Sequence, residues 1–221
     1  MADKEILIFV EGPSDKVFLE AYLYFLEDIP IKNFKVKDVT GKDNLSKRLL
    51  EIEKYDKTLI IFDADKDYES NKKEILSKTQ QKITEEQIFL FPNNQDDGDL
   101  ETLLLEIAKH DEFLKCFEGY LECIKSKEHY KPIKNISKSK WYAYLEVFEL
   151  QNFFKDKRNK NDKKNEEKII IDDKGKIRKE YKEEYEKLKE VIDFNSKSLI
   201  PLKNFLEQFA ENNQKTNLKI F

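Results

Sequence analysis

The fold is decided by a stretch near the start of the chain, ILIFVEGPSD at residues 6–15. Its first five residues are all apolar and include β-branched side chains, which predicts a strand covered on both faces. Gly12 and Pro13 then turn the chain, and apolar residues recur at helical spacing over 17–25. The stretch therefore predicts a strand followed directly by a helix, which is the start of a βα unit.

The same alternation continues outward from this stretch. Residues 59–62 and 88–91 are further apolar runs, residues 34–36 form a weaker alternating strand near an edge, and helical patterns lie between them. This predicts an α/β fold, a Rossmann-like and mainly parallel sheet of about four strands flanked by helices. Residues 1–112 form this predicted domain.

Residues 113–221 are expected to form a mostly helical extension that packs on the sheet domain. Their apolar residues repeat at helical spacing, and the aromatic stripe around Trp141 and Tyr142 is taken as core. An exposed or mobile loop is expected near 155–168, where no side chain is apolar, and a hairpin near 169–177. The two cysteines, Cys116 and Cys123, are expected to be reduced core residues on one helix face.

Composition places the 221-residue chain among soluble globular proteins, because 39% of its residues are charged and 39% hydrophobic. No apolar run approaches the thickness of a bilayer, so no membrane partner is expected. The charged start of the chain lacks the features of a signal peptide, which predicts a cytoplasmic protein.

Charge is distributed unevenly around the net value of −4. Residues 1–124 hold 17 basic and 28 acidic side chains, whereas residues 125–164 hold 12 and 5. An acidic first half beside a basic middle is typical of a protein whose carboxylates bind cations while its lysines attract a polyanion. The alternative is a solvated lysine-rich surface that reflects coding bias.

Acidic residues follow three of the predicted strands. They are Glu11 after the first, Asp63, Asp65 and Asp67 after residues 59–62, and Asp96, Asp97, Asp99 and Glu101 after residues 88–91. Ligands of open α/β sheets bind beyond the carboxyl ends of the strands, and converging carboxylates repel one another unless a cation lies among them. Oxygen ligands without His or Cys favour Mg²⁺ or Mn²⁺. For any single cluster, helix capping is the simpler explanation, and Asp67 in particular either caps the next helix or reaches a second ion.

At these residues the sequence resembles the Toprim superfamily, the catalytic module of topoisomerases, bacterial primases, the overcoming-lysogenization-defect nucleases and the 5S ribosomal RNA maturase. The resemblance rests on residues 6–15 and on IIFDADKD at 60–67, and it covers residues 5 to about 108. Small stand-alone Toprim-like bacterial proteins of unassigned function are the nearest match, through 92–101 and 142–145.

The resemblance implies a metal-dependent centre that breaks or joins phosphodiester bonds. It implies Glu11 as general acid/base or ligand, Asp63 and Asp65 as metal ligands, and Asp97 with Glu101 as a second metal site. A later lysine would stabilise the transition state, Lys140 being the first candidate and Lys138 the second. Lys16 and Lys42 are further candidates for contacts with nucleic-acid phosphates.

Two departures from the family restrict this expectation. Tyr68 replaces the glycine that often follows the aspartates, and no topoisomerase, primase or ATPase domain accompanies the core. The resemblance therefore implies a DNA or RNA nuclease, with any partner ATPase on a separate polypeptide, in defence or repair.

Three alternatives remain beside the nuclease. One is a non-catalytic Mg²⁺-binding subunit that recognises nucleic acid or a partner. Another is a receiver-like signalling domain, although a single Glu11 stands where a pair of acids is expected. The third is an Asp-x-Asp phosphatase, whose motif usually follows the first strand rather than the third.

Overall fold

The computed structural model describes residues 6–26, 31, 34–151, 154 and 182–210, and it contains the expected parallel sheet. The strands are β1 (Ile6–Val10), β2 (Phe34–Asp38), β3 (Lys57–Asp63) and β4 (Ile88–Phe91). All neighbouring pairs are parallel, and their order across the sheet is β2-β1-β3-β4. The prediction of an α/β, Rossmann-like fold is confirmed, and β2 lies at an edge as its sequence indicated.

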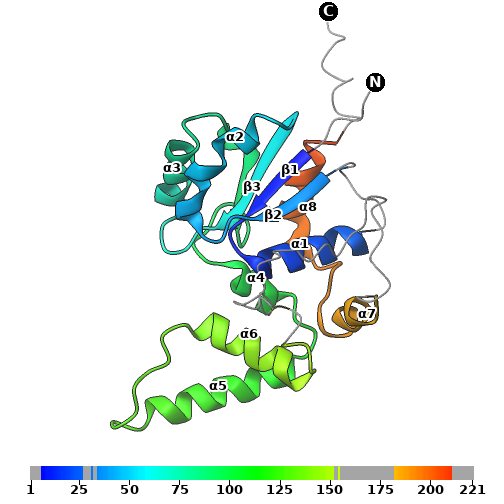
Figure 1. The fold of residues 1–221 in the computed structure, drawn as a ribbon. Helices are drawn as coiled ribbons and strands as arrows, with labels where there is room; N and C mark the ends of the chain where they lie inside the picture. The colour runs from blue at the N-terminus through cyan, green and yellow to red at the C-terminus, as the bar shows by residue number, and fades with distance from the viewer. Residues whose placement is uncertain (1–5, 27–30, 32–33, 152–153, 155–181, 211–221) are drawn as a thin grey trace, which may run out of the picture.

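Helices cover both faces of the sheet (Figure 1). One face carries α1 (Pro13–Phe25), α4 (Leu100–Glu106) and α8 (Ile200–Glu207). The other carries the 3₁₀ helix η1 (Lys42–Arg48), α2 (Leu49–Ile52) and α3 (Tyr68–Lys78). A short 3₁₀ turn, η2 (Glu85–Gln87), leads into β4.

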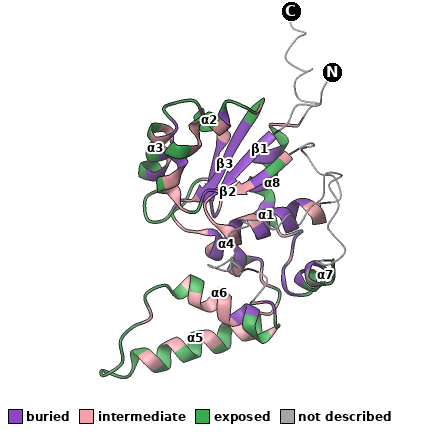
Figure 2. Ribbon diagram, viewed as in Figure 1, coloured by how far each residue is buried: buried purple, intermediate pink, exposed green. Residues whose placement is uncertain are grey.

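The central strands are buried on both sides (Figure 2). In β1, Ile6, Ile8 and Val10 enter the core beneath α1, whereas Leu7 and Phe9 enter the core beneath α2 and α3. A continuous apolar run thus supplies two cores, since successive side chains of a strand point to opposite faces.

The strand order reverses between β1 and β3. The chain leaves β1 through α1 on one face and leaves β3 through α3 on the opposite face. Loops that diverge in this way open a crevice at the carboxyl ends of the two strands, which is where ligands of such sheets bind. Glu11 and Asp63 stand at this point.

The later helices are α5 (Asp111–Lys125), α6 (Ile136–Val147), α7 (Lys182–Val191) and α8, with the 3₁₀ turn η4 (Lys197–Leu199) before α8. Trp141 and Tyr144 of α6 are buried in the core that α1 and α4 share, so the expectation that Trp141 is a core residue is confirmed. The predicted loop at 155–168 and the hairpin near 169–177 lie outside the described residues.

Helix α5 packs beside α6 and buries none of its own residues (Figure 1). Cys116 and Cys123 are therefore free and exposed, and their expected place in the core is wrong. Their seven-residue spacing puts them on one face of the helix, and both positions on that face are exposed. Within the described ranges, no helix is both long and apolar enough to cross a membrane.

Candidate metal centre

Four carboxyl groups from four elements lie within electrostatic reach of one another at the crevice between β1 and β3. Glu11 follows β1, Asp15 lies in the first turn of α1, Asp63 ends β3, and Glu101 lies in the first turn of α4. Their negative charges act on one another: Asp15 interacts with Glu11 and Glu101, and Asp63 with all three of the others. We call these four residues the carboxylate cluster.

Glu11 is positioned by the backbone on both sides of it. The parallel register pairs Val10 with Ile61, which puts Glu11 beside the end of β3, and the Glu11 carbonyl accepts a bond from Gly41 N at 2.9 Å. Burial raises the pKa of the Glu11 carboxyl, against the lowering effect of the Lys42 charge. Its Oε2 atom is buried and has no hydrogen-bond partner within the described part of the chain.

Asp15 is a site residue that the sequence analysis did not single out. Its carboxylate accepts a bond from Gly12 N at 2.6 Å, in a capping box at the start of α1. The side chain is buried, and this burial, with Glu101 and Glu11 nearby, raises the pKa of Asp15 to about 7. The available signal was its position one helical turn after Glu11, in a helix that begins where the strand ends.

Asp63 links the end of β3 to the start of α4. Its Oδ1 accepts a bond from Leu100 N at 2.9 Å, which holds the first turn of α4, and with it Glu101, at the crevice. Burial, followed by the charges of Asp15 and Glu11, raises the pKa of Asp63 well above its usual range. Burial also raises the pKa of Glu101, against the charge of Lys138.

Asp65 lies at the outer side of the cluster, and a lysine is bonded to it. The residue has a positive φ of 55° and forms an antiparallel bridge with Gly98, with N···O distances of 2.7 and 2.8 Å. Lys42 Nζ donates to Asp65 Oδ2 at 2.8 Å and also to Asn71 Oδ1. Gly98 itself has φ 147°, and a Cβ there would lie 2.9 Å from Pro92 Cδ, so the bridge requires glycine.

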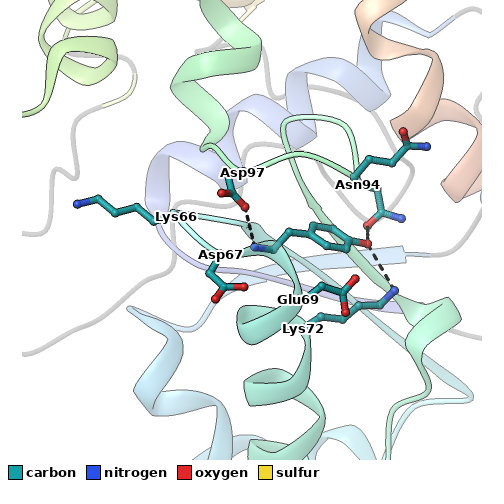
Figure 3. Close-up of a pocket in the computed structure, with 8 residues that line it drawn as sticks. Lys66, Asp67, Glu69, Lys72, Asn94 and Asp97 are labelled. Atoms are coloured by element: carbon teal, nitrogen blue, oxygen red, sulfur yellow. Dashed lines mark hydrogen bonds between the residues drawn. The ribbon is translucent and has the colours of Figure 1, made fainter.

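Other acidic residues at the same sheet edge bond to the starts of helices. Asp67 Oδ1 accepts a bond from Ser70 N at 2.9 Å and caps α3, and Asp99 Oδ1 accepts one from Thr102 N at 2.8 Å and caps α4. Asp97 Oδ1 accepts a bond from Tyr68 N at 2.8 Å (Figure 3). We call Asp67, Asp97 and Asp99 the capping acids.

Asp97 lies with Asp67, and the second metal site that the resemblance implied for Asp97 and Glu101 stays a prediction. Both line a pocket of about 560 Å³, and Asp97 points at the backbone of Tyr68 (Figure 3). Tyr68 in turn donates from its hydroxyl to Asn94 Oδ1 at 3.3 Å. Of the two roles considered for Asp67, the structure gives it the capping role.

The candidate lysines occupy different places. Lys138, in α6, is exposed, and its charge acts on Asp15 and Glu101. Lys140 donates to Glu118 Oε1 of α5 at 2.8 Å. Lys16 follows Asp15 in α1 and is partly exposed. A second pocket, lined by Asp65, Asp99 and Asn135 among others, brings the residue before α6 to the same sheet edge.

The donor atoms of the carboxylate cluster fit a hard divalent cation. All are carboxylate oxygens, and burial raises the pKa of each of them. For Asp15 and Asp63 the charges of other cluster members raise the pKa further, and Glu11 Oε2 is buried without a partner in the described structure. Glu11, Asp15, Asp63 and Glu101 are the residues that would hold it. In the described residues, no three His, Cys, Asp or Glu side chains are already drawn together closely enough to enclose an ion.

Comparison with known proteins gives a family but no function. No curated protein and no solved structure matches the chain. One family model, described as "Protein of unknown function (DUF3226)", matches residues 5–211. The match spans the sheet, the carboxylate cluster and the C-terminal helices, and the chain therefore belongs to the DUF3226 family.

Proposed function

We propose that this protein is a Toprim-like, metal-dependent phosphodiesterase that cleaves DNA or RNA. The observation that carries the proposal is the carboxylate cluster, which gathers buried and half-buried acids from four elements at the topological switch point of the sheet. Buried like charges are unfavourable unless a cation compensates them, and an oxygen-only site selects Mg²⁺ or Mn²⁺. The resemblance of residues 6–15 and 60–67 to the Toprim motifs supports the same chemistry.

Each residue of the cluster has a role in this proposal. Asp15, Asp63 and Glu101 would bind the ion, and Glu11 would bind it or transfer a proton, since its raised pKa brings it closer to neutral pH than an exposed glutamate. A bound divalent ion would supply positive charge that activates water and stabilises the leaving oxygen. Asp63 also fixes α4 through Leu100 N, so it positions Glu101.

The proposed polyanionic substrate requires positive charge around an acidic centre. Exposed lysines occupy the end of α5, the following loop and the start of α6, namely Lys125, Lys127, Lys131, Lys134 and Lys138. Asn135, within this segment, lines the pocket that also contains Asp65. Lysines at this place would hold phosphates next to the cluster. Their contribution to nucleic-acid affinity should fall steeply as the salt concentration rises.

The test is cleavage of plasmid DNA, single-stranded DNA and RNA during titration with Mg²⁺ or Mn²⁺. The variant is Asp63→Asn, which removes a charge but keeps the oxygen that accepts from Leu100 N. We expect metal-dependent cleavage in the natural protein and a loss of at least about 1,000-fold in the variant. Glu106→Gln is the matched control, because Glu106 is an exposed acid on the same helix as Glu101.

Other results would support other functions. Mn²⁺ binding that Asp63→Asn abolishes, with no cleavage of any substrate, would favour the non-catalytic subunit. Phosphorylation of Asp63 by a small phosphodonor would favour the receiver-like domain. Equal cleavage by Asp63→Asn and the natural protein would rule out the proposed centre.

A further inference from the structure

The cluster and its surroundings divide into two parts with different charge compensation. On one side, Asp65 and Glu11 lie with Lys42, whose charge lowers the pKa of Glu11. On the other side, Asp15, Asp63 and Glu101 repel one another, and the lysine that acts on Asp15 and Glu101 is the exposed Lys138. Lys42 is bonded to an acid of the first part, whereas the second part has the larger surplus of negative charge.

Lys42 is fixed in place more firmly than a surface lysine. Its side chain is 12% exposed, whereas that of its partner Asp65 is 56% exposed. Asn71, which accepts its second bond, is buried and donates to the carbonyls of Ala64 and Asp67. The ammonium is therefore held by a chain of hydrogen bonds that begins in the backbone of the loop after β3.

The backbone before Lys42 also connects it to the edge of the sheet where the carboxylate cluster lies. Gly41 has φ 98° and donates from its N–H to the Glu11 carbonyl at 2.9 Å. The 3₁₀ helix η1 starts at the next residue, so Lys42 leaves this turn at a defined place. A lysine fixed in this way loses little conformational entropy when it acts as a permanent cation.

We propose that the Lys42 ammonium takes the place of a second metal ion, so that the protein binds one divalent cation. The inference rests on the proposed function and specifies its metal requirement. The one ion would bind at Asp15, Asp63 and Glu101 with Glu11, while Lys42 neutralises Asp65 and acts on Glu11 through its charge. Lys42 is a positioning residue for Glu11 and Asp65.

The test counts bound Mn²⁺ by electron paramagnetic resonance, which detects the free aqueous ion, and needs no substrate. The natural protein is expected to bind one Mn²⁺. Lys42→Met keeps the aliphatic stem but removes the charge, so it should bind two, with the first on the order of tenfold more tightly than in the natural protein. Lys42→Arg should bind one.

Lys47→Met is the matched control. Lys47 belongs to the same 3₁₀ helix, and its ammonium donates to Asn44 Oδ1 at 2.7 Å rather than to a residue of the cluster. The Lys47→Met variant should bind one Mn²⁺ with the affinity of the natural protein. Adding Asp65→Asn to Lys42→Met should remove the second ion, because Asp65 would be a ligand of that ion.

The outcomes separate this inference from the proposed function. Two Mn²⁺ in the natural protein, or one in a folded Lys42→Met variant, would overturn the role of Lys42 and leave the nuclease proposal intact. One bound Mn²⁺ with no cleavage would contradict the nuclease alone. No bound Mn²⁺ in any form of the protein would overturn both.

Discussion

Two sets of acidic residues lie at the same edge of the sheet and differ in what surrounds them. The capping acids bond to backbone amides at or near the starts of α3 and α4, and Asp67 and Asp97 are exposed. The carboxylate cluster lies where β1 and β3 diverge, and burial there raises each pKa. The position of an acid after a strand therefore does not determine its role, since each of β3 and β4 is followed by members of both sets.

The two sets should contribute to stability with opposite signs. A carboxylate at a helix start stabilises the fold, since it satisfies an amide that has no partner within the helix. Carboxylates buried together destabilise the metal-free fold, because each loses solvation and repels the others. Substitutions in the two sets should therefore differ in direction as well as in size.

Asp15→Asn should have the largest effect. It should weaken Mg²⁺ binding about 100-fold, since even residues that only support a ligand contribute 10-fold to 100-fold. It should also stabilise the metal-free protein at pH 8 by on the order of 2 kcal/mol, because the amide keeps an acceptor for Gly12 N without the buried charge. Calorimetric Mg²⁺ titration and urea unfolding measure the two effects.

Asp111→Asn is the control for this substitution. Asp111 is also an acid in a first helical turn, that of α5, but it is exposed. The Asp111→Asn variant should bind Mg²⁺ with unchanged affinity, and it should not stabilise the metal-free protein. A destabilised Asp15→Asn variant with normal Mg²⁺ affinity would make Asp15 a capping residue only.

The stability difference between Asp15→Asn and the natural protein should depend on pH. The folded pKa of Asp15 is about 7, above the usual value of 3.8 for an aspartic acid, so between these values the folded state retains a proton that the unfolded state has released. The free energy of unfolding of the natural protein then falls as pH rises through this window, by up to roughly 1.4 kcal/mol per pH unit. The advantage of the variant should be small at pH 4, grow up to about pH 7, and then level off.

Urea unfolding at several pH values in a metal chelator measures this difference. Excess Mg²⁺ should reduce the loss of stability of the natural protein at high pH, because the ion binds the deprotonated carboxyls. A difference that stays constant from pH 4 to pH 8 would contradict the raised pKa of Asp15.

The sequence predicted the sheet because β1, β4 and residues 59–62 of β3 are uninterrupted apolar runs, and such runs fit few structures other than buried strands. Glu11 and Asp63 followed from the same pattern, since they end neighbouring strands. Asp15 was missed because an acid in the first turn of a helix is usually a cap. Asp15 differs from an ordinary cap in being buried, which depends on how α1 and α4 pack into a shared core on the sheet and not on local sequence.

The bond between Asp97 and Tyr68 N could not be predicted from the sequence for a related reason. The family resemblance pairs Asp97 with Glu101. The two residues are four apart, which in a helix would put them on one face, but α4 begins only at Leu100. The bridge between Asp65 and Gly98 turns the preceding loop toward α3, where Asp97 meets Tyr68. A long-range contact between two loops therefore decides which acids are neighbours.

Asp67→Ala should destabilise the protein by about 1 kcal/mol, the usual effect of removing an N-cap. Mg²⁺ affinity should stay within about twofold, because Asp67 bonds to Ser70 N and is not part of the cluster. Asp67→Asn is the matched variant, since asparagine also caps helices, and it should recover most of the stability. A tenfold loss of Mg²⁺ affinity in Asp67→Asn would place Asp67 among the ligands.

Lys138 and Lys140 provide the smallest and most selective comparison. The charge of Lys138 acts on Asp15 and Glu101, whereas Lys140 is paired with Glu118 on α5. Lys138→Met should weaken binding of a single-stranded oligonucleotide at low salt by a few-fold, and the effect should vanish at high salt, as expected when about one phosphate contact is lost. Lys140→Met should leave binding unchanged, since its partner is a carboxylate within the α5 and α6 pair. Fluorescence anisotropy across a salt series measures the affinity of both variants. A larger loss of affinity in Lys140→Met would indicate that Lys140, the residue that the family resemblance favoured, contacts the substrate.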